Sequence, residues 1–112
     1  MAEDRLKAKL WVQATVRSCF AQGYAATVVR KGDEDAGMVL IKQNLMGSGF
    51  RVLTKMRTAE GSLAWLRGTG AEPVEEQVAD DYIARQIERD YDIWVVEIEE
   101  RSGRLPFEDK VL

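Results

Sequence analysis

The segment Val74–Glu100 constrains the fold most, because its apolar period changes within a few residues. Pro73, a residue favoured in the first turn of a helix, precedes it. A stripe at helical spacing then follows, made of Val78, Ala79, Tyr82, Ile83, Gln86 and Ile87. The run Asp90–Asp92 breaks this pattern, and Ile93–Ile98 has the composition of a strand. The segment therefore predicts a helix followed by a strand that is buried on both faces at its start, with Trp94 in the core.

The rest of the chain completes an α+β pattern. From about Leu10 the apolar residues have helical spacing, including Val12 and Cys19, and Gly23 is a stop signal. Lys7 and Lys9 suit a helix N-terminus poorly, so we expect the helix to begin after them. Four further runs have strand character and are separated by turn residues: Tyr24–Lys31, Met38–Asn44, Phe50–Arg57 and Leu63–Arg67.

We expect one domain over residues 1–112, since a chain of this length forms a single core. The short loop 32–37 predicts a hairpin between the first two strands. The predicted architecture is an antiparallel β-meander of about five strands packed against two α-helices, with the last strand rejoining the sheet. Residues 1–9 and 105–112 are expected to be frayed tails, the second with one apolar anchor, Phe107.

The composition excludes several chemistries. Histidine is absent and Cys19 is the one cysteine, so the chain alone cannot build a Ser–His–Asp triad, a Cys–His pair or a structural zinc site. We expect no cofactor, and any metal would be a hard cation held by carboxylates. There is no apolar run of membrane-spanning length and no signal peptide, so we expect no membrane association. With one cysteine, this indicates the cytoplasm.

The charge is distributed unevenly along the chain. Residues 1–70 carry eleven basic and six acidic residues, whereas residues 71–112 carry five and thirteen. Either the two parts pack together and compensate each other, or the surface is bipolar and pairs with a partner or with itself. The acidic balance argues against nucleic-acid binding. The feature that weakly supports nucleic-acid binding is a set of basic residues on the predicted meander: Arg51, Lys55, Arg57 and Arg67.

The most suggestive polar set lies around the end of the second helix and the last strand. It comprises Arg85, Gln86, Arg89, Glu97, Glu99 and Glu100. Because helix and strand follow each other across a tight turn, we expect several of these groups to meet. The set has three interpretations: a surface ion-pair network, a ligand or partner surface built on arginine, or carboxylates that bind Mg²⁺ or transfer protons.

Two other features are weaker candidates. Asp33 and Asp35 resemble the opening of a calcium loop, but Met38 and Asn44 stand where that loop needs glycine and glutamate. A hairpin turn explains them better. Trp65 lies in a weak strand near basic residues and is a candidate ligand or interface contact, with a core position as the alternative.

Several of these residues carry a resemblance to a family. They are Trp11-Val12, Gly32-Asp33 with Ala36-Gly37, and above all Ala84-Arg85-Gln86 followed by Asp90-x-Asp92-Ile93-Trp94-Val95-Val96-Glu97-Ile98-Glu99. Over residues 5–104 the chain resembles the alphaproteobacterial proteins grouped as domain of unknown function 1491. The resemblance implies a bacterial cytoplasmic origin and brings no mechanism with it.

These observations favour a non-enzymatic cytoplasmic protein that binds another protein or itself, because the chain has no catalytic motif and a sheet offers a free edge. A small carboxylate- or Mg²⁺-dependent enzyme around Glu97 and Glu99 is the alternative. A nucleic-acid-binding module is the weaker alternative.

Overall fold

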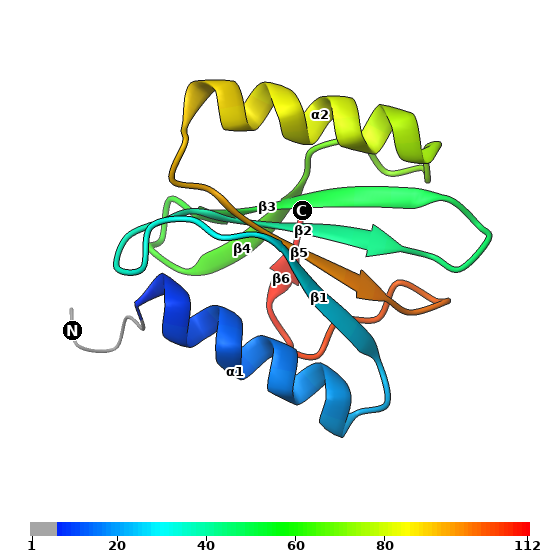
Figure 1. Ribbon diagram of the computed structural model, residues 1–112, viewed down its shortest axis with the longest axis horizontal. Helices are drawn as coiled ribbons and strands as arrows, with labels where there is room; N and C mark the ends of the chain where they lie inside the picture. The colour runs from blue at the N-terminus through cyan, green and yellow to red at the C-terminus, as the bar shows by residue number, and fades with distance from the viewer. Residues whose placement is uncertain (1–6) are drawn as a thin grey trace.

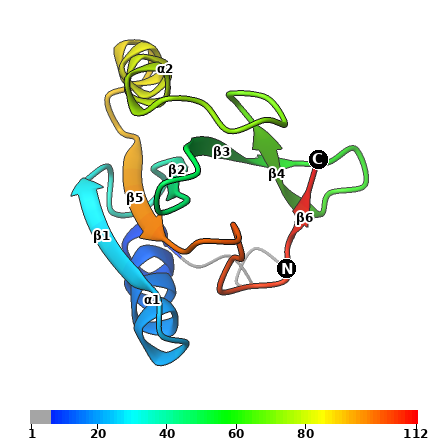
Figure 2. The ribbon, with the colours of Figure 1, turned by 90° about the vertical axis from the view of Figure 1, so that its right-hand side faces the viewer.

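The structure, a computed structural model, describes residues 7–112 of the chain. The two helices are α1 (Ala8–Ala21) and α2 (Glu76–Arg89). The strands of the described residues are β1 (Ala25–Arg30), β2 (Val39–Asn44), β3 (Phe50–Arg57), β4 (Leu63–Arg67), β5 (Trp94–Glu99) and β6 (Lys110–Val111). The helices lie on opposite faces of one sheet (Figure 1). Figure 2 shows that the sheet curves around the side that carries α1 and the C-terminal segment.

The α+β class is confirmed, but the sheet is mixed. Its order is β1-β5-β2-β3-β4-β6. β2, β3 and β4 form the predicted antiparallel meander, whereas β5 lies antiparallel to β1 and parallel to β2, and β6 lies parallel to β4. The predicted hairpin between β1 and β2 is therefore wrong, because β5 separates these two strands.

The composition of β5 explains its place between two neighbours. Trp94, Val96 and Ile98 belong to the core beneath α1, and Val95 belongs to the core beneath α2. A strand that is apolar on both faces is stable where both faces are covered. Trp94 is 4% exposed, which confirms its predicted core position. Its indole nitrogen donates a hydrogen bond of 2.6 Å to the carbonyl of Asp33.

α1 begins earlier than the sequence predicts. Residues 1–6 of the expected frayed N-terminus lie outside the described residues, but helix geometry starts at Ala8. The amide of Lys9 donates to the carbonyl of Glu34 at 2.9 Å, and its ammonium lies 3.6 Å from the Glu34 carboxylate. The loop after β1 thus supplies the acceptors and negative charge that a basic helix start lacks.

The expectation of a frayed C-terminus is also wrong. Phe107 stacks on Trp65 with ring centroids 5.5 Å apart, and the amide of Leu112 donates to the carbonyl of Trp65 at 2.8 Å. Residues 105–112 cross the concave side of the sheet and end beside β4 (Figure 2). The alternation of Leu105, Phe107 and Val111 suits this extended segment, because alternate residues of an extended chain share a face.

The other face of the sheet is covered by α2. Ala79 and Ile83 pack with Leu40, Val52 and Val95. Val78, which the helical stripe includes, is 47% exposed. Across residues 7–112, neither helix combines the length and apolarity needed to cross a membrane.

Candidate functional site

The structure does not bring the predicted polar set together. Arg85 and Arg89 are exposed and Gln86 is partly buried, and within residues 7–112 no hydrogen bond or ion pair joins them to Glu97 or Glu99. α2 and β5 run in opposite directions. Four strand residues cover about 13 Å, which is about nine helix residues, so Glu97 lies beside the N-terminal half of α2. The arginines remain at the opposite end.

Glu97 instead belongs to a cluster around Lys42, a residue of β2 that sequence reasoning did not select. The ammonium of Lys42 lies 2.7 Å from Asp80 Oδ1, 2.8 Å from Glu76 Oε2 and 4.0 Å from Glu97 Oε1. Asn44 Nδ2 donates to Glu97 at 3.1 Å. The Lys42 side chain is 8% exposed, so a full charge is held inside the interface between β2 and α2.

The electrostatics of this cluster favour a structural role. Burial alone would lower the pKa of Lys42, but hydrogen bonds to Asp80 and Glu76 outweigh it and hold that pKa above its ordinary value. A nucleophilic lysine needs a lowered pKa, so this ammonium is set up as a permanent charge. The signal for it in the sequence was a lysine within an apolar strand, which requires acidic partners elsewhere.

The predicted metal candidates have other partners. Asp33 Oδ2 accepts hydrogen bonds from the amides of Asp35 and Ala36, which closes the turn after β1. The Asp35 carboxylate lies 3.5 Å from the ammonium of Lys7. In the described part of the chain, no group of three or more metal-ligating side chains is arranged to hold an ion.

Trp65 is a core residue rather than a surface contact. It is 0% exposed, and its indole nitrogen donates to Asp109 Oδ2 at 3.1 Å. Trp11 and Phe107 pack against it with ring centroids 5.7 and 5.5 Å away. The ammonium of Lys55 lies 4.1 Å from the centre of the Trp11 ring, and burial lowers the pKa of Lys55. The predicted basic set of the meander is therefore partly covered, since Lys55 lies beneath α1.

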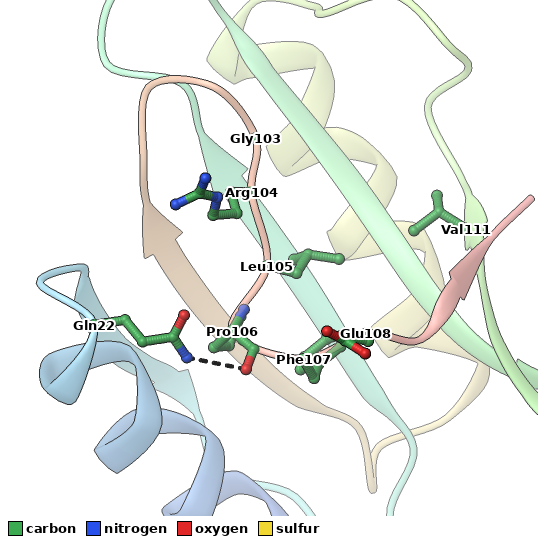
Figure 3. A pocket seen from close by; sticks show the side chains of 8 residues that line it. All are labelled: Gln22, Gly103, Arg104, Leu105, Pro106, Phe107, Glu108 and Val111. Carbon is green, nitrogen blue, oxygen red and sulfur yellow. Dashed lines mark hydrogen bonds between the residues drawn. The ribbon is translucent and has the colours of Figure 1, made fainter.

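An open hollow of about 650 Å³ lies beside the C-terminal segment. Figure 3 shows its lining, in which Gln22 Nε2 donates to the carbonyl of Pro106 at 3.1 Å. The charged groups in the lining are Arg104 and Glu108, which have opposite signs. The hollow therefore presents no concentrated charge that would select a ligand.

The free edge of β1 is the most open feature of the sheet. β1 pairs with β5 on one side and has no neighbour on the other within the described residues. Residues 25–29 are uncharged, and Val28 and Val29 are 37% and 55% exposed. Free strand edges are usually protected by charges, proline or covering segments, since their backbone groups can pair with another chain.

Comparison with known proteins places the chain in a family. The model of the family described as a protein of unknown function (DUF1491) matches residues 6–108. No curated protein matches the chain. The crystal structure of a DUF1491 family protein from Caulobacter crescentus CB15 is similar with a TM-score of 0.85 and 35% identity, covering 96% of this chain and 100% of that one.

Two solution structures are also similar. The NMR structure of a DUF1491 family protein from Caulobacter crescentus CB15 has a TM-score of 0.82 and 36% identity, covering 96% of each chain. Protein Atu0922 from A. tumefaciens has a TM-score of 0.71 and 29% identity, covering 95% of this chain and 97% of that one. These relatives are consistent with an alphaproteobacterial origin. The chain belongs to the DUF1491 family, whose function is unknown.

Proposed function

We propose that this chain is a non-enzymatic binding protein of the bacterial cytoplasm, which accepts an extended, uncharged polypeptide strand along the free edge of β1. The observation that carries the proposal is this edge, which is six residues long and without charge from residue 25 to residue 29. Backbone N–H and C=O groups of such an edge bind a strand through ladder hydrogen bonds.

The side chains of the edge indicate the chemistry of the partner. Val28 and Val29 present apolar surface, so the matching strand carries small or β-branched apolar residues. Charged residues in the partner would lose hydration without gaining an opposite charge from β1.

The single cysteine supports the interior of a bacterial cell. Cys19 is 0% exposed and unpaired, and burial raises the pKa of its thiol, which keeps it protonated. A single buried thiol suits a reducing compartment. The permanent charge on Lys42 and the inward position of Glu97 support a binding role over carboxylate catalysis.

A labelled peptide with the sequence of residues 24–31 provides a probe, because it is an extended strand of the required chemistry. With a trace of the labelled peptide and the protein titrated from about 1 μM to about 500 μM, fluorescence anisotropy should show saturable binding with a dissociation constant between about 10 μM and about 100 μM. A peptide with proline in place of Ala26 should not bind, since proline at this position removes an N–H that donates to the ladder.

Variants of the protein locate the binding site. Val28→Lys should weaken peptide binding at least about tenfold. Leu66→Lys is the matched control, because Leu66 is a 46% exposed apolar residue of β4, away from β1. The proposal fails if the peptide does not bind, or if both lysine variants weaken binding equally.

A further inference from the structure

The partner strand that best fits the β1 edge is the β1 edge itself. Resting on the strand-binding function proposed above, we infer that two copies of this chain pair antiparallel along β1 about a two-fold axis and form one continuous sheet. Three observations carry this inference: the faces of β1, the flank of α1 beside it, and the charges at its two ends.

The register follows from the faces of β1. Ala26 and Val28 pair with Ile98 and Val96, so both lie on the α1 side of the sheet, whereas Thr27 lies on the other side. Directly opposed residues of an antiparallel pair share a face. A two-fold axis at Thr27 meets this condition, since it opposes the two Thr27 side chains and sets Val28 of each copy against the small Ala26 of the other.

A bulge limits the length of this pairing. The register of β1 against β5 shifts between Val28 and Arg30. A bulge bends its strand and disturbs the ladder, so the regular edge ends near Val28. The register centred on Thr27 uses this regular part and leaves Arg30 beyond it.

α1 extends the same surface. Trp11 lies on the flank of α1 that contacts Trp65, a residue of β4 near the far end of the sheet. Phe20 is nine residues further on, which is about two and a half helical turns, so it lies on the opposite flank, toward β1. Its side chain is 61% exposed.

Phe20 is level with the beginning of β1, because only the turn from Gln22 to Tyr24 separates the helix from the strand. A two-fold axis at Thr27 reverses the second strand. Phe20 of one copy then lies alongside Val28 of the other. Because of the two-fold symmetry, this apolar contact forms twice in the dimer. A parallel arrangement would leave both Phe20 side chains at the same end without a partner.

The charges at the strand ends favour the same orientation. Arg30 is the last residue of β1 and Lys31 follows it, whereas Glu99, which pairs with Ala25, lies beside the other end. Antiparallel pairing brings the basic end of each copy toward the acidic end of the other. No like charges meet in the centre, because residues 25–29 are uncharged.

The interface is small for a stable complex. A short strand edge and one helix flank bury less than the about 800 Å² per partner of standard interfaces. We therefore expect a reversible dimer that forms at micromolar concentrations, and sedimentation equilibrium of the full chain from about 5 μM to about 500 μM covers the transition.

As the concentration increases, the average molecular mass should rise from that of a monomer to that of a dimer for the natural chain and for Leu66→Lys. Val28→Lys should stay a monomer. Circular dichroism should show that all three proteins are equally folded. A natural chain that stays monomeric throughout overturns the inference. If that monomer still binds the peptide of residues 24–31, the strand-binding function stands and only the second copy is excluded. A dimer that Val28→Lys leaves intact also overturns the inference.

Cysteine cross-linking tests the register. Thr27→Cys should form an intermolecular disulfide under mild oxidation, because the two positions face each other on the axis. Ala25→Cys, at another exposed position of β1, should not, since it opposes Val29 in this register. The natural Cys19 is 0% exposed and does not compete. Equal cross-linking at both positions would refute the proposed pairing.

Discussion

The ammonium nitrogen of Lys42 lies 2.7 Å from Oδ1 of Asp80, across the interface between β2 and α2. Glu76 on the same helix and Glu97 on β5 share this cation. One buried lysine therefore fixes the position of α2 along two central strands. Apolar packing between helix and sheet lacks this specificity, since it is non-directional.

Removing the cation should destabilise the protein. Lys42→Met keeps an apolar side chain of similar length and removes the ammonium group. Three carboxylates then face each other without a positive charge. We expect a loss of about 1–3 kcal/mol in the free energy of unfolding, below the full value for a buried pair because Glu76 and Asp80 are about half exposed. Urea denaturation measures it. Lys9→Met, which removes an exposed pair, is the control and should change stability by less than about 0.5 kcal/mol; equal effects would contradict the assigned role.

The same cluster predicts a dependence on alkaline pH. The pKa of Lys42 is raised in the folded chain, so its stabilising contribution is complete below the unfolded-state pKa of about 10.4 and is lost as the pH rises through the higher folded value. The difference in unfolding free energy between the natural chain and Lys42→Met should therefore be constant from about pH 7 to pH 9 and shrink above about pH 10.4. Urea titrations across this range would show it. A difference that already falls between pH 7 and pH 9 would mean that this pKa is not raised.

Trp94→Ala should be among the most destabilising single substitutions. The side chain is 4% exposed, and its removal leaves a large cavity beneath α1 and frees the carbonyl of Asp33. We expect a loss of about 3–5 kcal/mol by thermal or urea unfolding. Tyr91→Ala, at a 75% exposed position three residues earlier, should stay within about 0.5 kcal/mol. A small effect at Trp94 would mean that the faces of β5 are reversed.

Asp109 tests whether the C-terminal segment is part of the fold. Asp109→Ala removes the acceptor of the buried Trp65 indole N–H, which should reduce stability by about 1–3 kcal/mol. Asp109→Asn keeps an acceptor oxygen and should lose less than half as much. Indole proton exchange followed by NMR provides a second measurement. Equal, negligible effects of both variants would show that residues 105–112 do not stabilise the sheet.

Gly32 tests the close approach between the loop after β1 and the start of β5. A Cβ atom at Gly32 would overlap the carbonyl of Asp92, and one at Gly37 would lie 2.5 Å from the same oxygen. Gly32→Ala should therefore destabilise the chain by at least about 2 kcal/mol. At Gly61, with a φ of 89° and open space around it, alanine should lose about 1 kcal/mol from backbone strain alone. Circular dichroism melting of the two variants compares them, and a smaller loss at Gly32 than at Gly61 would disprove the close approach.

The periodicity of apolar residues predicted the helices and strands well, because it depends on residues that are close together in the sequence. β3 and β4 have the predicted bounds, and β2 begins one residue later than predicted. β1 is one residue shorter than predicted at each end, and β5 is shifted by one residue toward the C-terminus. The pairing order was not predicted, since a period of two does not identify the neighbouring strand. One signal for it was present: the run from Ile93 to Ile98 is apolar on both faces, which favours a central strand over an added edge strand.

The polar cluster was misplaced for a related reason. Arg89 and Glu97 are close in sequence, but the chain reverses between them and a strand advances twice as far per residue as a helix. The actual partner of Glu97, Lys42, is remote in sequence. As binding candidates, Arg85, Gln86, Arg89 and Glu99 stay predictions.

The insertion of β5 between β1 and β2 also has a consequence for biosynthesis. β1 is made early, but the strand that attaches it to the rest of the sheet follows more than sixty residues later. A growing chain can form the β2–β3–β4 meander during translation, whereas α1 and β1 cannot pack on the sheet until β5 has been synthesised. Such distant pairing slows folding, so the segment of α1 and β1 is the part in which we expect chaperones to engage and off-pathway strand pairing to begin.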